Sequence, residues 1–241
     1  MVSLPLDSLV YRADAGPRCL VLLHGYGEPA SDLTDRLHLL DPGRRFVVVV
    51  PTAPIQWRGR RIWHRPLTSP DEAATQYVSS VSALDDLVGA IDDELGIPPA
   101  ETVVGGFSQG GGLAIGLLIG ADVEHRPAAG FGVCSFPPVV PGFRVDQVAA
   151  TGRRYFLSSA RDDHFASIDI SRQGARALRA VGLDLTYVEA DGGHEMTDVA
   201  ATRIGQWLAG AAGRPEGEPP DLLGDSDAPT MYDGMWEVVS R

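Results

Sequence analysis

The sequence predicts an α/β fold, with a mostly parallel, doubly wound sheet and helices on both of its faces. Short apolar runs alternate along the chain with longer segments whose apolar residues recur at a helical period of about 3.6. Several short runs are apolar without interruption, which is typical of strands buried on both faces of a parallel sheet. The length of 241 residues suits one large domain of this class.

The expected strands are short apolar runs that end at residues favouring turns. In chain order they are residues 9–11, 19–23, 46–50, 102–104, 128–134, 155–159 and 183–189. The first is expected to be a weak edge strand, and the turn-forming residues 14–17 follow it. The last alternates apolar and polar side chains, as a half-buried strand does.

The expected helices are amphipathic and begin or end at residues that cap helices. They run from Ser31 or Asp32 to Leu40, over 72–94, from just after Ser108, over 168–181, and around 199–208. Gly96 and the prolines beyond it mark the end of the long second helix. Residues 55–71, between a strand and that helix, are expected to form an irregular loop.

Composition divides the chain into an expected α/β domain, residues 1–213, and an acidic tail rich in Pro and Gly, residues 214–241. The tail holds seven acidic residues against two arginines. Residues 214–220 have the composition of a linker. Aromatic residues return over 231–239, so that part either docks on the domain or frays.

Charge and hydropathy exclude several classes of protein. A formal charge of −12 and a pI near 4.8 argue against nucleic acid or an anionic membrane surface as a partner. We expect no membrane insertion, because no apolar stretch approaches the roughly 18–20 residues that cross a bilayer. The N-terminal residues lack a secretory pattern, so a cytoplasmic location is expected. Cys19 and Cys134 fall within expected strands and predict inert core thiols, with no disulfide or metal site.

The most informative motif is the G-x-S-x-G of Gly106, Ser108 and Gly110, between an expected strand and an expected helix. A strand that reverses into a helix within a few residues holds the serine in a strained, exposed position. The residues two before and two after it must lack bulk, because strand and helix approach closely there. The motif predicts Ser108 as a nucleophile, with the amide of Gln109 free to hold an oxyanion.

Further reactive residues follow the expected strands downstream of Ser108. Asp162 and Asp163 come after the strand 155–159, and His194 lies in a glycine-rich turn after the last strand. Catalytic groups gather at the carboxyl ends of parallel strands. An imidazole can take the serine proton, and a carboxylate can orient that imidazole. Ser108, His194 and one of the aspartates therefore predict a catalytic triad.

Several motifs together resemble the phospholipase/carboxylesterase family of α/β-hydrolases, which includes acyl-protein thioesterases and small bacterial carboxylesterases. They are Leu23-His24-Gly25-Tyr26-Gly27, Pro51-Thr52-Ala53-Pro54, Trp63, Gly106-Phe107-Ser108-Gln109-Gly110-Gly111 and Gly193-His194. The likeness spans roughly residues 18–210. The chain order Ser, Asp, His is that of α/β-hydrolases. The resemblance implies the α/β-hydrolase fold and an oxyanion hole at the amides of Tyr26 and Gln109.

The resemblance also bears on the triad acid. Members of this fold commonly show G-x-x-D at the end of the corresponding strand. Ala160-Arg161-Asp162-Asp163 fits with Ala160 in place of glycine, which favours Asp163. A frame shifted by one residue makes Ser159 the small residue and Asp162 the acid, so that alternative stays open. His64, where an aspartate is common, and the acidic tail are further departures from the family and bear on substrate choice.

Five side chains in loops after expected strand ends are candidates for the wall of an acyl pocket: Trp57, Trp63, Phe136, Phe165 and Met196. Ordinary packing is the alternative role for each of them. Four arginines of the loop 55–71 either attract an anionic substrate or form a solvated surface cluster: Arg58, Arg60, Arg61 and Arg65.

These residues predict a serine carboxylic-ester hydrolase of the carboxylesterase or thioesterase type, acting through an acyl-serine intermediate. It needs no metal or organic cofactor, and its partner is a small-molecule ester or thioester. A lysophospholipase, or another serine hydrolase of the same fold, is the alternative. A non-catalytic binding protein is disfavoured, because binding does not require these residue types at three separate strand ends. Oligomeric state is not predicted, and removal of residues after Gly213 is expected to leave an active hydrolase.

Overall fold

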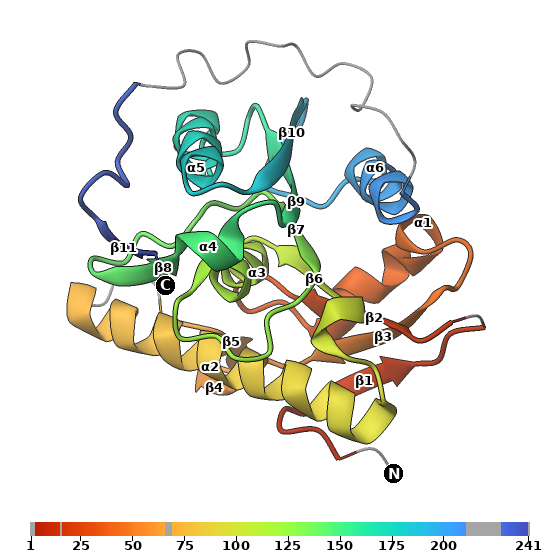
Figure 1. Ribbon diagram of the computed structural model, residues 1–241. Helices are drawn as coiled ribbons and strands as arrows, with labels where there is room; N and C mark the ends of the chain where they lie inside the picture. Colours follow the sequence, from red (N-terminus) through yellow and green to blue (C-terminus); the bar gives the residue numbers. More distant parts are fainter. Residues whose placement is uncertain (1–2, 15, 66–68, 211–227, 241) are drawn as a thin grey trace.

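The computed structural model describes residues 3–14, 16–65, 69–210 and 228–240, arranged around a seven-stranded sheet (Figure 1). The strand order is β1-β3-β2-β6-β7-β9-β10. Its strands are β1 (Ser8–Tyr11), β2 (Arg18–Leu23), β3 (Phe46–Pro51), β6 (Thr102–Phe107), β7 (Ala129–Val133), β9 (Arg154–Ala160) and β10 (Asp184–Ala190). β1 pairs antiparallel with β3, whereas the other neighbours pair in parallel. The predicted mostly parallel sheet is confirmed.

The helices cover both faces of this sheet, as the sequence predicted. They are η1 (Ala30–Arg36), α1 (Leu37–Leu40), α2 (Pro70–Leu95), η2 (Pro99–Glu101), α3 (Gln109–Ile119), α4 (Gln147–Ala150), α5 (Ile168–Ala180) and α6 (Asp198–Leu208). α2 begins two residues before the predicted start, because Ser69 caps it by accepting a hydrogen bond from the amide of Glu72. It ends where predicted, at Gly96, whose φ of 66° is left-handed.

The two faces of the sheet bury two separate apolar clusters. Successive side chains of a strand point to opposite faces. Thus Val21 and Leu23 of β2 pack in the cluster that contains α2, α3 and α5, whereas Leu20 and Leu22 pack in the one that contains α1 and α6. Figure 1 shows α1 and α6 together on one side and α2 and α3 on the other. This arrangement leaves the carboxyl ends of the parallel strands free to carry functional loops.

Two short two-stranded sheets lie outside the central one: β4 (Ile55–Trp57) with β5 (Arg60–Ile62), and β8 (Phe143–Asp146) with β11 (Trp236–Val239). The prediction of an irregular loop over 55–71 was wrong for its first half. Arg58 and Gly59 both adopt positive φ, 49° and 77°, which is the two-residue turn that closes a β-hairpin. An arginine in this conformation is uncommon, so Arg58 is not a residue from which a turn of this type is predicted.

The end of the acidic tail is docked on the domain. β11 pairs in parallel with β8, and the side chain of Tyr232 is buried. The sequence left docking and fraying open for residues 231–239, and the structure shows docking. The predicted linker, 214–220, lies outside the described residues, and the division of the chain at residue 213 stays a prediction.

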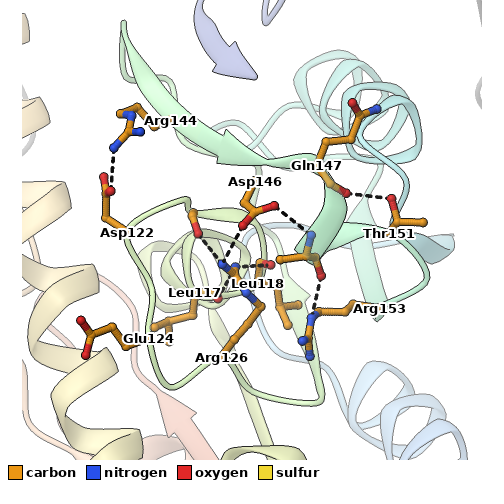
Figure 2. A network of polar contacts seen from close by, with 12 residues as sticks. Leu117, Leu118, Asp122, Glu124, Arg126, Arg144, Asp146, Gln147, Thr151 and Arg153 are labelled. Atoms are coloured by element: carbon orange, nitrogen blue, oxygen red, sulfur yellow. Dashed lines mark hydrogen bonds and ion pairs between the residues drawn. The ribbon is translucent and has the colours of Figure 1, made fainter. Parts of the chain in front are cut away.

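A partly buried network of polar contacts ties β8 to the far end of α3 (Figure 2). The Arg126 guanidinium donates to the carbonyls of Leu118 and Gly120, each at 2.7 Å, and lies 3.9 Å from a carboxylate oxygen of Asp146. Cations and hydrogen-bond donors stabilise the C-terminal end of a helix, whose last carbonyls lack partners. Asp146 ends β8 and caps α4 by accepting from the amide of Ala149. β8 is therefore fixed to the helix that follows β6.

Among the described residues, no helix combines the length and the apolar character that crossing a membrane would require.

Candidate active site

Ser108 lies at the sharp turn between β6 and α3. Its φ of 52° and ψ of −117° are costly for any residue with a side chain. The neighbouring strand holds this backbone in place, because the amide of Ser108 donates to the carbonyl of Val133 at 2.9 Å. The half-buried serine therefore stands at the N-terminus of α3, at the centre of the sheet.

Two glycines allow this turn to close. An added Cβ atom would lie 2.4 Å from the Leu23 carbonyl oxygen at Gly106 and 2.1 Å from the same oxygen at Gly110. Both distances are far below van der Waals contact, and the obstacle is backbone of the adjacent strand β2. The lack of bulk that the sequence predicted at these two positions is thus required by the approach of α3 to β2.

We expect Gly110→Ala to lower the free energy of unfolding by about 1–3 kcal/mol, because the methyl group must push helix and strand apart. Chemical denaturation followed by circular dichroism measures the loss. Gly43→Ala is the control, since its Cβ would lie 3.5 Å from the nearest side-chain atom of Arg45. That control is expected to stay within about 0.5 kcal/mol of the wild type. Equal stability of Gly110→Ala and the wild type would contradict the close approach.

Three side chains from three separate strand ends form a continuous hydrogen-bonded chain. The Nε2 atom of His194 lies 2.9 Å from Oγ of Ser108, and its Nδ1 atom lies 2.8 Å from Oδ2 of Asp163. Asp163 follows β9 and His194 follows β10, while Ser108 follows β6. The turns at the carboxyl edge of the sheet thus bring together the three residues that the sequence favoured.

The hydrogen bonds fix the protonation of this chain. An ionised carboxylate can only accept, so Nδ1 of His194 carries the proton and Nε2 is left to accept from the serine hydroxyl. Burial alone would raise the pKa of Asp163. Hydrogen bonds from His194 and from the amides of Ala166 and Phe165 outweigh burial, so the pKa lies below its ordinary value. The carboxylate therefore remains ionised beside the imidazole.

Asp162, the alternative acid, is exposed and has no part in this chain of hydrogen bonds. Its amide donates to the carbonyl of Gly192, which joins the turn after β9 to the turn that carries His194. The backbone of Asp162 thus aligns the two turns, whereas the side chain of Asp163 contacts the imidazole. The side chains of adjacent residues in such a turn point in different directions. A shift of the sequence pattern by one residue therefore decides which aspartate contacts the imidazole.

The backbone amides of Tyr26 and Gln109 lie at two adjacent strand ends, because β2 and β6 pair directly. Gln109 is the first residue of α3, so its amide has no acceptor within the helix. The loop that carries Tyr26 is held on both sides. Gly25 donates to the carboxylate of Glu28 at 3.0 Å, and Gly27 donates to the carbonyl of Arg61 at 3.1 Å. The hairpin β4–β5 therefore supports this loop.

A buried imidazole, His24, fixes the base of the same loop. Its Nε2 atom accepts from the amide of Ala53 at 3.1 Å, so Nδ1 carries the proton and donates to the carbonyl of Gly25 at 2.8 Å. Burial lowers the pKa of His24, which favours this neutral form. Trp63 packs against the ring and donates from Nε1 to the carbonyl of His24 at 2.9 Å. The sequence motif contained His24 without revealing this role.

A cavity of about 280 Å³ opens beside Ser108 and His194. Two of the five predicted wall residues, Phe136 and Phe165, line it. Phe165 is 78% exposed and places its ring 5.0 Å from that of His194. The remaining lining is mainly apolar: Ala73, Tyr77, Pro137, Pro138, Val139, Val140 and Ala166.

Trp57, Trp63 and Met196, the other three predicted wall residues, lie outside the lining of this cavity. Trp63 is fully buried, because its indole N–H is bonded beneath the loop of His24. Met196 packs in the apolar cluster that contains α6. Trp57 lies beneath the guanidinium of Arg65, 4.3 Å from the ring centroid. An aromatic residue after a strand has no local signal that tells packing from pocket lining.

The four arginines of the predicted loop also lie outside the lining of this cavity. Arg65 forms an ion pair with Glu72 at 3.0 Å, and the side chains of Arg58, Arg60 and Arg61 are exposed. Within the described residues this arrangement matches the solvated surface cluster, the second of the two alternatives.

Gln109 has a second role that the sequence did not reveal. Its side-chain oxygen accepts from the amide of Trp63 at 3.3 Å, and its Nε2 atom donates to the carbonyl of His64 at 2.8 Å. These bonds hold His64 at the cavity, where its ring lies edge-on to Tyr77. Burial lowers the pKa of His64, so the ring is a neutral part of the wall. The departure from the family at His64 thus lies in the cavity itself.

Cys134 is a buried residue in the lining of the same cavity. Its Sγ atom and one oxygen or nitrogen each of Asp163 and His194 lie within 4.8 Å of one another. The pKa of the thiol is raised to about 12, first by burial and then by the charge of Asp163. The Nδ1 atom of His194 is committed to Asp163. A protonated thiol and an occupied imidazole nitrogen make this group unsuited to bind a metal.

We expect both cysteines of the native protein to resist iodoacetamide at pH 8. Burial also raises the pKa of Cys19 to about 12, so only about one part in 10⁴ of either thiol is ionised at that pH. Intact-mass analysis after alkylation checks this, with the unfolded protein as a control in which both thiols react. Rapid modification of one thiol in the native protein would contradict the burial of that cysteine.

The comparisons with known proteins identify the fold and the family of the chain. The fold and site define an α/β-hydrolase, with helices on both faces of a mostly parallel sheet. A model of the family described as phospholipase/carboxylesterase matches residues 8–197. The chain belongs to this family, as its motifs predicted. It is also 22% identical over 198 residues to MhqD of Bacillus subtilis (strain 168), which covers 82% of this chain and 96% of that protein.

Solved structures share the fold at low sequence identity. The Bacillus cereus carboxylesterase superposes with a TM-score of 0.75 at 18% identity, covering 86% of this chain and 95% of that one. A carboxylesterase from Mesorhizobium loti gives 0.73 at 18% identity, with 87% and 97% covered. Acyl-protein thioesterase 2 from Zea mays gives 0.67 at 18% identity, with 85% and 98% covered. The tail segment 228–240 lies beyond the residues that the family model matches.

Proposed function

We propose that this protein is a serine esterase that hydrolyses carboxylic esters or thioesters of small molecules through an acyl-serine intermediate. One observation carries the proposal: the hydrogen-bonded chain from Ser108 through His194 to Asp163 opens onto an apolar cavity. The base lies 2.9 Å from the nucleophile and 2.8 Å from the acid, which satisfies the geometric requirement for nucleophilic catalysis.

In the first step Oγ of Ser108 attacks the carbonyl carbon of the ester or thioester. The serine proton passes to Nε2 of His194, and Asp163 stabilises the imidazolium that results. The carbonyl oxygen becomes an oxyanion, which the amides of Tyr26 and Gln109 receive as hydrogen-bond donors. The intermediate collapses as the bond to the leaving group breaks. His194 returns its proton to the departing alcohol or thiol, which leaves an acyl-serine.

In the second step a water molecule attacks the acyl-serine, again with His194 as the base. The same amides hold the second oxyanion, and Ser108 leaves with the proton returned from His194. The carboxylic acid then departs and restores the starting state. Every proton moves between the substrate, water and the Ser108–His194 pair, so the cycle needs no redox or metal cofactor.

The wall of the cavity favours an apolar acyl chain. Phe136, Phe165 and the side chains between Pro137 and Val140 offer hydrocarbon surface. The volume of about 280 Å³ is at the small end of the range for ligand sites, so short to medium chains fit best. A lysophospholipase, the alternative of the same chemistry, would require room for a long acyl chain. Chain-length preference separates the two.

The first test is labelling with a fluorophosphonate, read by intact mass, beside hydrolysis of p-nitrophenyl esters from acetate to decanoate. We expect one adduct in the wild type, none in Ser108→Ala, and the highest kcat/KM for a chain shorter than decanoate. A preference for the longest chain would transfer the assignment to the lysophospholipase type. Absence of both adduct and turnover in folded wild type would refute catalysis and favour a binding role.

A further inference from the structure

We propose that the C-terminal segment, residues 228–240, sets the shape of the acyl pocket by holding the loop 136–142 that forms its wall. Tyr232 and Trp236 act as positioning residues for this loop. The proposal rests on the proposed function, since the loop matters to catalysis only if the cavity receives the acyl group. It assigns a role to a part of the chain that lies beyond the residues matched by the family model, 8–197.

The loop 136–142 has few backbone N–H groups with which to bond to the rest of the protein. It connects the turn after β7 to β8, and residues 136–140 all line the cavity. Three of its residues are prolines, at 137, 138 and 141, which lack an N–H to donate to the rest of the protein. The carbonyls of Pro137 and Pro138 still need donors if they are shielded from water. The loop has few N–H groups of its own, so donors to these two carbonyls are expected from another segment.

The C-terminal segment supplies them. Nε1 of Trp236 donates to the carbonyl of Pro138 at 2.9 Å, and the hydroxyl of Tyr232 donates to the carbonyl of Pro137 at 3.5 Å. In the opposite direction, the amide of Gly142 donates to the carbonyl of Met235 at 2.8 Å. The two aromatic rings pack on each other with centroids 4.8 Å apart. Three hydrogen bonds thus join the wall loop to a segment about a hundred residues away in sequence.

The segment itself is anchored to fixed parts of the domain. β11 pairs with β8 along its whole length, from Trp236 opposite Phe143 to Val239 opposite Asp146. At the other end, the amide of Met231 donates at 2.9 Å to a side-chain oxygen on α5, that of Gln173. Figure 2 shows the contacts of Arg126 and Asp146 that fix β8 to the end of α3, the helix that carries the nucleophile turn. β8 therefore links the position of the wall loop to α3, the helix that begins just after Ser108.

α5 also packs against the loop 136–142. A Cβ atom added at Gly174 would lie 2.4 Å from Cδ of Pro137. The first proline of the loop thus rests directly on the backbone of α5, and the Tyr232 hydroxyl lies near the same place. The loop thus contacts α5 on one side, and the C-terminal segment donates to its carbonyls, while residues 136–140 line the cavity.

The consequence for catalysis depends on the length of the acyl chain. An acetyl group has one carbon beyond the carbonyl and a hexanoyl chain has five, so we expect the hexanoyl chain to make far more contact with the loop that lines the cavity. If the wall is loosened, a hexanoyl ester must order it on binding, and that ordering reduces the binding energy available to the transition state. Loosening the segment is therefore expected to lower kcat/KM for esters with longer acyl chains and to leave the chemical step unchanged.

The test compares Trp236→Phe with the wild type and with Glu237→Ala. The phenylalanine keeps an aromatic ring and loses the N–H that reaches Pro138. Glu237 lies on the same strand with an exposed side chain, so its variant controls for a general effect of changing β11. The measurements are kcat/KM for p-nitrophenyl acetate and hexanoate, the thermal midpoint of each variant, and hydrogen exchange at the amides of residues 136, 139, 140 and 142.

For Trp236→Phe we expect kcat/KM for hexanoate to fall about fivefold, the worth of one hydrogen bond, while that for acetate stays within about twofold. Exchange at the four loop amides should become faster. Glu237→Ala should match the wild type in every measurement. An equal fall for both esters, or no change in either, would overturn the proposal. If the wild type hydrolyses neither ester, the proposed function fails. Hydrogen exchange then decides by itself whether the C-terminal segment holds the loop 136–142: faster exchange in Trp236→Phe supports this, and unchanged exchange refutes it.

Discussion

Replacing Ser108 with alanine is expected to lower kcat for p-nitrophenyl esters by roughly 10⁴- to 10⁶-fold. The nucleophile is then missing, and His194 has no hydroxyl from which to take a proton. The amides of Tyr26 and Gln109 remain in place, so a small residual rate from oxyanion binding should persist. Steady-state kinetics with an active-site titration of the wild type give the ratio.

Ser135→Ala provides the matched control for that variant. Ser135 lines the same cavity and is 1% exposed, yet it lies outside the chain of hydrogen bonds from Ser108 to Asp163. Its loss is expected to change kcat by less than about tenfold, since the reaction involves no group on it. A large fall in Ser135→Ala with an active Ser108→Ala would move the nucleophile to the other serine and refute the mechanism.

Replacing Asp163 with asparagine is expected to lower kcat about 10⁴-fold while leaving the fold intact. Asp163 accepts from His194 and from the amides of Phe165 and Ala166. An amide side chain of the same shape can donate to Nδ1 of His194, which would place the imidazole proton on Nε2. His194 would then face the serine with a proton instead of a lone pair and could not act as the base. The pH dependence of kcat, measured between pH 5 and 9, should show no recovery of the base in this variant.

Asp162→Asn is the control for that result and separates the two frames of the sequence pattern. The Asp162 side chain is exposed, and its contribution to the turn comes from its backbone amide, which asparagine keeps. We expect kcat within about twofold of the wild type. If Asp162→Asn were the inactive variant and Asp163→Asn the active one, the acid would be Asp162 and the hydrogen bond to His194 would be without catalytic meaning.

The parts of the structure that sequence predicted best are those with local causes. Buried strands such as 46–50 show as unbroken apolar runs, and the end of α2 shows as Gly96, where left-handed backbone is required. The turn at Ser108 can be predicted from the sequence because glycine is needed on both sides of it. In each case the signal lies within a few residues of the element that it predicts.

The parts that sequence missed depend on partners far along the chain. β11 is four residues long and pairs with β8, about ninety residues earlier, so no local pattern marks it as a strand. Trp63 resembled a pocket residue because it follows a strand, and its burial depends on the carbonyl of His24. Phe136, which does line the cavity, carried the same kind of local signal. Only the assembled fold distinguishes the two.

The left-handed backbone at Ser108 has a consequence for how this chain can change under selection. A glycine at that position would relieve the strain of φ 52° and favour the folded state, but it would remove the hydroxyl. In the proposed esterase, selection for thermal stability and selection for activity would therefore act in opposite directions at this residue.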